Sequence, residues 1–215
     1  TFIGAINNSH INLSCLEYLH ENNCPVPYNI FDIVIKYNNF IIFKFLIEKK
    51  YSLINKNHYR MIIEYKYVKY LKILLENISI DNIMNIDEQK ILYYYAIEHK
   101  SLDCIKCLHE HKIKCASNIC DYAVHYNNID ILEYLHENNY ILAKSTFQTA
   151  LNIGSISCLI YLYKNNCPYD KEINITTIRY TQHSIEFLYE IGYISKNQYQ
   201  NALEMHHSSI FRYNE

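Results

Sequence analysis

The residues of this sequence whose types best suit chemistry lie between positions 104 and 120. Thiolate and imidazole groups are common ligands of structural zinc, and a CxxC pair followed by further cysteines and histidines is a spacing that zinc sites use. The residues of this kind are Cys104, Cys107, His109, His111, Cys115 and Cys120. A zinc site is therefore one hypothesis for this stretch, and it requires a fold that brings about four of these side chains together.

A histidine followed directly by a glutamate occurs three times, and such a pair is suited to general acid–base catalysis. The pairs are His20-Glu21, His109-Glu110 and His136-Glu137. Their repetition argues against a single active site, and a histidine in the last turn of a helix also interacts favourably with the helix dipole. The sequence has no Gly-rich phosphate loop, no serine nucleophile elbow and no HExxH motif. We therefore predict that the chain is not an enzyme and uses no cofactor.

Both patterns lie within a ten-residue block that occurs seven times along the chain. The starts of successive blocks are 26 to 34 residues apart. A period in this range indicates structural repeats that stack on one another. The blocks span residues 14–23, 41–50, 69–78, 103–112, 130–139, 157–166 and 183–192.

The pattern inside each block predicts a helix with one buried face. The second, third, fifth and sixth positions are mostly apolar, and residues spaced in this way lie on one side of a helix. The eighth position is glutamate or lysine, which indicates that the opposite side is exposed. The sixth position is always leucine: Leu19, Leu46, Leu74, Leu108, Leu135, Leu162 and Leu188.

The repeat explains most of the eight cysteines, since four lie within the block and two more, Cys24 and Cys167, directly follow it. Cys104 and Cys107 occupy the second and fifth positions of the block, and Cys15 and Cys158 also occupy the second. Cysteine behaves as a small hydrophobic residue at such positions, so we expect core packing rather than zinc ligation or disulfide bonds. Reduced thiols are typical of the cytosol.

Composition and charge limit the classes of partner. The 215 residues carry a formal net charge of −2, so the chain has no basic field of the kind that attracts nucleic acid. The sequence has no run of about 18 apolar residues, and its start does not resemble a signal peptide. We predict a soluble cytosolic chain without nucleic-acid or membrane partners.

A second helix is predicted before each block. Aligning the repeats by their leucines places a small or apolar residue at one position of this first helix, the alanine position: Val34, Ile62, Ala96, Ala123, Ala150 and Thr176. The residues two positions before and after it are polar or tyrosine in most copies and form i, i+4 pairs that face one way. We predict that these residues form an exposed stripe, which is the candidate protein-binding surface: Asp32, Lys36, Arg60, Glu64, Tyr94, Glu98, Asp121, His125, Gln148 and Asn152.

Turn and capping residues predict where the helices begin and end. Residues that tolerate a positive φ follow many of the helices, as at Asn38, Asn127 and Gly154. The longest spacing between blocks predicts an extended loop over residues 79–88. Three polar residues are expected to cap first helices, and Ile210 is expected to begin an eighth block. The expected caps are Asp87, Ser117 and Ser195.

These observations predict an all-α fold: a single α-solenoid of helix-turn-helix repeats, about seven in number with a partial eighth. The ends of such a stack expose an apolar face, which we expect to pack against further repeats or a partner. The repeats span approximately residues 1–27, 28–54, 55–86, 87–116, 117–144, 145–170, 171–194 and, for the partial repeat, 195–215.

Three runs of sequence carry a resemblance to a known family. Residues 15–25 (CLEYLHENNCP), 131–139 (ILEYLHENN) and 158–170 (CLIYLYKNNCPYD) resemble the ankyrin-type repeats of about 27 residues that occur in many copies in proteins of giant DNA viruses of amoebae and in some protists. The Thr-Pro-Leu-His opening and the glycines of ordinary ankyrin repeats are missing, and the loop that forms a β-hairpin finger is shorter. The resemblance implies an α-solenoid of ankyrin-like helix-turn-helix repeats that takes part in protein–protein interaction without catalysis.

The leading hypothesis is therefore a non-catalytic protein–protein interaction module, viral in origin and directed at a host or viral protein. The alternative is a structural component of a virus particle or of another large assembly. The first hypothesis places the chain in the cytoplasm of the host cell, and the second places it in the virion.

Overall fold

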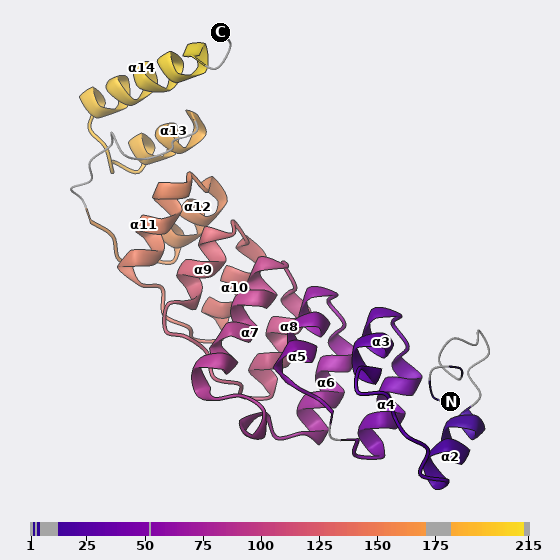
Figure 1. Cartoon of the computed structure of the whole chain (residues 1–215). Coiled ribbons are helices and arrows are strands. Elements are labelled where there is room, and N and C mark those ends of the chain that lie inside the picture. Colours follow the sequence, from indigo (N-terminus) through magenta and orange to yellow (C-terminus); the bar gives the residue numbers. More distant parts are fainter. Residues whose placement is uncertain (1, 3, 5–12, 52, 171–181, 213–215) are drawn as a thin grey trace. The chain divides into compact units, whose positions relative to one another are not determined.

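The computed structural model describes residues 2, 4, 13–51, 53–170 and 182–212, with side chains up to residue 205. Within these residues the protein is all-α, with 13 α-helices, one short 3-10 helix and no strand (Figure 1). The chain forms two compact units, Thr1–Cys115 and Ala116–Glu215, which we call unit 1 and unit 2. None of the described helices combines the length and the hydropathy needed to span a membrane.

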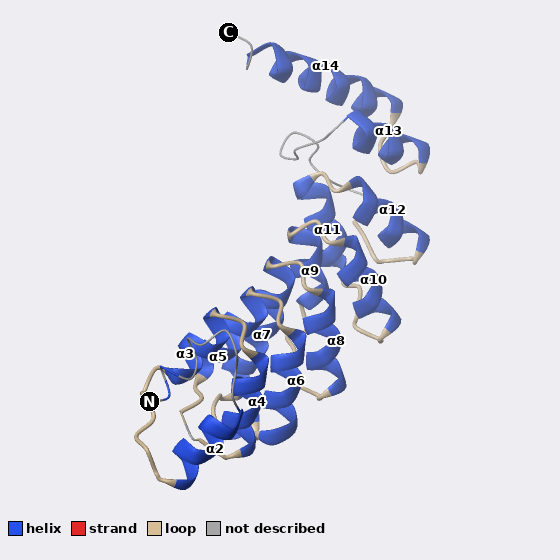
Figure 2. Cartoon of the chain, turned by 90° about the vertical axis from the view of Figure 1, so that its right-hand side faces the viewer, coloured by secondary structure: helices blue, strands red, loops and turns tan. Residues whose placement is uncertain are grey.

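Unit 1 contains consecutive helical hairpins. Its described helices are α2 (Leu13–Glu21), α3 (Ile30–Lys36), α4 (Phe40–Glu48), α5 (Lys56–Glu64), α6 (Val68–Asn77), η1 (Ile80–Asn82), α7 (Ile86–Glu98) and α8 (Leu102–Glu110). The hairpins form because α3 packs on α4, α5 on α6 and α7 on α8. The first helices α3, α5 and α7 lie side by side, and so do the second helices α4, α6 and α8 (Figure 2).

Unit 2 repeats this arrangement. Its described helices are α9 (Ile119–His125), α10 (Ile129–Glu137), α11 (Lys144–Ile153), α12 (Ile156–Lys164), α13 (Gln182–Glu190) and α14 (Lys196–Arg212). The helices α9 and α11 pack side by side, as do α10 and α12, and α13 packs on both α12 and α14. The first helix predicted around Thr176 lies outside the described residues.

The leucine and alanine positions form the core, as the repeat pattern predicts. All seven block leucines are buried, and the polar eighth position is exposed in every block. Val34, Ile62, Ala96, Ala123 and Ala150 have no exposed surface. Small side chains at this position allow neighbouring first helices to approach closely, which explains why three of the five are alanine.

Left-handed residues end many of the helices. The predicted turns at Asn38, Asn127 and Gly154 have φ values of 52°, 48° and 70°, so these three predictions are confirmed. Blocks also end on left-handed residues, for example Lys112 (φ 56°), whereas the third block ends in extended backbone at Ile78 (φ −127°). In all, nine described residues other than glycine have a positive φ.

The predicted helix caps are partly wrong. The helix α9 begins after Asn118 rather than Ser117. In α7 the cap is Asn85 rather than Asp87, because Asn85 accepts from the backbone N–H of Glu88 while Glu88 accepts from that of Asn85. Ser195 is confirmed as a cap, since its hydroxyl accepts a hydrogen bond from the backbone N–H of Gln198.

Two predictions about the ends of elements also need correction. The predicted loop over residues 79–88 contains η1 and the first turn of α7, which begins at Ile86. The helix α14 continues to Arg212 without a break, so no eighth block begins at Ile210. The sequence from residue 206 to residue 212 contains no glycine or proline, and these are the residues that would favour an earlier end of the helix.

Candidate protein-binding surface

The structure places none of the ten stripe residues in the core. In unit 1, α3, α5 and α7 each contribute one pair, and in unit 2, α9 and α11 each contribute one. Four of the ten are half-buried: Asp32, Tyr94, Asp121 and Gln148. The other six are exposed: Lys36, Arg60, Glu64, Glu98, His125 and Asn152. Their role in binding remains a prediction.

Two of the half-buried residues hold neighbouring first helices together. In unit 2 the hydroxyl of Thr146 on α11 donates a hydrogen bond to Asp121 on α9. In unit 1 the Nε2 atom of His58 on α5 lies 3.3 Å from Oδ1 of Asp32 on α3. Both pairs join the same two repeat positions, so this contact recurs in the two units. The carboxylates of Asp32 and Asp121 therefore stabilise the row of first helices.

His58, the partner of the stripe residue Asp32, is a buried titratable group. Its side chain is nearly inaccessible, and its Nδ1 atom accepts a hydrogen bond from the backbone N–H of Asn55 at 3.0 Å. This bond requires an unprotonated Nδ1, so the neutral imidazole directs its Nε2–H toward Asp32. Burial lowers the pKa of His58, and the nearby Asp32 carboxylate opposes that shift without cancelling it.

The lowered pKa of His58 predicts a loss of stability in acid. Since the folded chain takes up this proton less readily than the unfolded chain, the contribution of His58 is complete above its ordinary value of 6.5 and is lost as the pH falls below it. We expect the free energy of unfolding, measured by urea denaturation, to decrease as the pH falls below 6.5. The His58→Gln variant should show a smaller decrease, whereas His125→Gln, at an exposed position, should behave as the unaltered chain.

A cation–π contact and an ion pair join α5 to α7. The guanidinium carbon of Arg60 lies 5.1 Å from the ring centroid of Tyr95. One turn earlier on α5, Nζ of Lys56 lies 2.8 Å from Oε1 of Glu88. This ion pair lowers the pKa of Glu88 and raises that of Lys56. The sequence pattern predicted Arg60 as a surface residue but did not predict Lys56, Glu88 or Tyr95. Their contacts join two different helices, and the packing of these helices cannot be read from the pattern within one helix.

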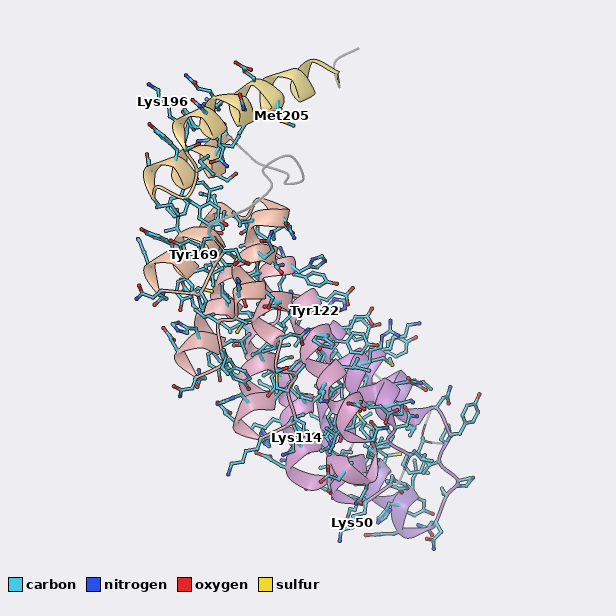
Figure 3. All side chains as sticks on the ribbon, turned by 90° about the vertical axis from the view of Figure 1, so that its left-hand side faces the viewer. Lys50, Lys114, Tyr122, Tyr169, Lys196 and Met205 are labelled. Atoms are coloured by element: carbon cyan, nitrogen blue, oxygen red, sulfur yellow. The ribbon has the colours of Figure 1, made fainter. Side chains whose placement is uncertain are left out.

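In unit 2 an aromatic group accompanies the stripe. The ring centroids of Tyr122 on α9 and Tyr126, the residue that follows α9, are 5.8 Å apart. His125 packs against Tyr126 at 5.4 Å (Tyr122 is labelled in Figure 3). On α11 the side-chain amide of Gln148 donates to Oδ1 of Asn152 at 2.9 Å. Aromatic and amide groups of this kind are adaptable contacts in protein interfaces.

The cysteines and histidines between positions 104 and 120 do not converge. Cys104 and Cys107 are buried in α8, and burial raises the pKa of both thiols, that of Cys107 to about 12. His111 donates from Nδ1 to the backbone carbonyl of Cys107 at 2.8 Å. Within the described residues, no three His, Cys, Asp or Glu side chains are placed so that they could hold a metal ion. One part of the cysteine prediction is wrong, since Cys15 is exposed rather than in the core.

The histidines of two His-Glu pairs have contacts with tyrosines of the next repeat. Nδ1 of His20 is hydrogen-bonded to the hydroxyl of Tyr51 at 2.8 Å, and Nδ1 of His136 to that of Tyr161 at 2.9 Å. These contacts join neighbouring hairpins, which gives both histidines a role in packing.

Comparison with known proteins gives no match to this arrangement: no family model, no curated protein and no solved structure matches the chain.

Proposed function

We propose that this protein is an ankyrin-like solenoid that binds another protein through the exposed stripe of its first helices and carries out no catalysis. The observation that carries the proposal is that helices with fully buried core positions present charged, amide and aromatic side chains on their accessible side in both units. Repeat proteins use extended surfaces of this kind for recognition, and arginine and tyrosine are frequent among the residues that dominate binding.

Preorganisation supports this proposal. Side-by-side packing of the first helices, together with the contacts from His58 to Asp32 and from Thr146 to Asp121, fixes the backbone under the stripe. A partner then binds without the cost of ordering that backbone. The specificity comes from side chains that differ between repeats, as Arg60 and Tyr94 do.

The chemistry of the candidate groups favours binding over catalysis. His20 and His136 contact tyrosine hydroxyls, and the thiols of Cys104 and Cys107 are buried with raised pKa values. A nucleophilic thiol needs a lowered pKa and access to a substrate, and neither condition holds at these two residues. The resemblance to repeats of giant DNA viruses directs the proposal to a host or viral protein, and hence to the host cytoplasm or the virion.

Replacing both Arg60 and Tyr94 with alanine is expected to reduce partner capture on the order of tenfold, because arginine and tyrosine often dominate the binding energy of an interface. The measurement is affinity purification from infected or host cells followed by quantitative mass spectrometry. The melting temperature should change little, because Arg60 is exposed and Tyr94 is only half-buried.

Lys69→Ala provides the matched control, since Lys69 is exposed on the second helix α6, away from the stripe. It should capture the same partner as the unaltered chain. Equal loss of capture in both variants, or unfolding of the Arg60 and Tyr94 double variant, would contradict the assignment of the stripe as the binding surface.

A further inference from the structure

A cavity of 180 Å³ lies between α5 and the segment formed by η1 and α7 in unit 1. The buried side chains of Met84 and Leu92 contribute apolar lining, and the partly exposed Ile91 adds to it. Arg60 and Tyr95 line the same cavity and are held together by their cation–π contact. Apolar surface and a cationic group therefore adjoin each other at one site of the predicted stripe.

Arg60 is the cation of this cavity that lacks a carboxylate partner within the described residues. The other cation, Lys56, is paired with Glu88, so that their charges offset each other. The guanidinium carbon of Arg60 lies over the ring of Tyr95, and this contact leaves the guanidinium N–H groups as donors for other groups. These donors form a fork that matches a carboxylate, and the group remains charged at every physiological pH.

The size of the cavity decides what kind of apolar group fits it. Sites for cofactors and drug-sized ligands are typically about 300–1,000 Å³. A cavity of 180 Å³ is below that range and suits one aliphatic side chain. The helices α5 and α7 border the cavity on its two sides. A bound side chain therefore enters from the solvent, between these two helices.

We propose that this cavity binds a segment of a partner protein in which an aspartate or glutamate lies next to a large aliphatic residue. The carboxylate accepts hydrogen bonds from the guanidinium of Arg60, and the aliphatic side chain enters the cavity beside Ile91, Met84 and Leu92. The proposal rests on the proposed function and adds to it the chemical class of the recognised segment.

An array of short immobilised peptides tests this proposal with the full chain as the probe. Each peptide carries Glu, Asn or Lys beside Leu or Ser in a Gly-Ser background. The expected result is that Glu-Leu peptides retain the chain at least about tenfold more strongly than Asn-Leu or Glu-Ser peptides. Arg60→Met should abolish the preference for Glu over Asn, and Arg60→Glu should shift the preference to Lys-Leu peptides.

Two further variants separate the charge from the cavity. Ile91→Trp should occlude the cavity and remove the preference for Leu over Ser, while Ile91 is exposed enough for the fold to tolerate the change. Lys69→Met is the control and should bind as the unaltered chain does. Equal retention of Glu-Leu and Asn-Leu peptides, retention unaffected by Arg60→Met, or no retention of any peptide would each overturn the proposal.

These results are distinguishable from a failure of the proposed function. If the unaltered chain captures a protein from cells but shows no preference for acidic peptides, the proposed protein binding stands and the proposed recognition of an acidic segment by this cavity fails. If it captures no protein and retains no peptide, both proposals fail.

Discussion

Replacing Leu135 with alanine is expected to lower the free energy of unfolding by about 2–5 kcal/mol. Leu135 has 0% of its surface exposed and lies in α10, which packs against α9 and α12. Removing its three outer carbon atoms eliminates buried apolar surface and leaves a cavity that rigid helices on both sides cannot fill. Urea denaturation followed by circular dichroism measures the loss.

Ile141→Ala is the matched control for Leu135→Ala. Both substitutions remove an aliphatic side chain of equal size from unit 2, but Ile141 is 75% exposed. The control should change the free energy of unfolding by no more than about 0.5 kcal/mol. Similar losses in the two variants would mean that the block leucines are not the core of the repeats.

Replacing Tyr59 with phenylalanine is expected to raise the free energy of unfolding by about 1 kcal/mol, whereas the same change at Tyr93 should lower it by about as much. Both residues have 0% exposure. Within the described residues the hydroxyl of Tyr59 has no hydrogen-bond partner, and burial raises its pKa. The hydroxyl of Tyr93 donates to the backbone carbonyl of Ile113 at 3.3 Å.

The comparison is well matched because Tyr59 and Tyr93 occupy the same position of successive first helices, three residues before the alanine position. Phenylalanine already fills that position in two other repeats, as Phe31 and Phe147, both fully buried. The repeat therefore accepts a ring without a hydroxyl. A loss of stability in Tyr59→Phe equal to that in Tyr93→Phe would show that the Tyr59 hydroxyl has a partner after all.

The core of the repeats could be predicted because it depends on residues within one helix. A leucine at the sixth block position is buried in every repeat, since the helical period places it on the same face each time. The caps were less predictable. Asn118 and Ser117, like Asn85 and Asp87, are both capable of capping, and the choice depends on where the preceding loop places the chain.

The sequence could predict which side of the first helices forms the candidate surface, but not the contacts that its residues make. The i, i+4 spacing correctly kept all ten residues out of the core, but the contacts of those residues depend on the neighbouring repeat. The bond from Thr146 to Asp121 and the approach of His58 to Asp32 join residues 25 or more positions apart. The cavity beside Arg60 is lined in part by Met84, which follows η1 in the longest gap between blocks. The repeat pattern could not specify the structure of these extra residues.

The left-handed asparagine and lysine residues at the ends of the helices have a consequence for how the protein tolerates heat. An L-residue in this conformation costs about 1–2 kcal/mol, and the cost is smaller for asparagine and absent for glycine. Nine such residues occur in the described chain, four of them lysines: Lys50, Lys66, Lys100 and Lys112. Replacing these lysines with glycine is consequently expected to raise the melting temperature of the protein, since glycine adopts this conformation without the steric cost.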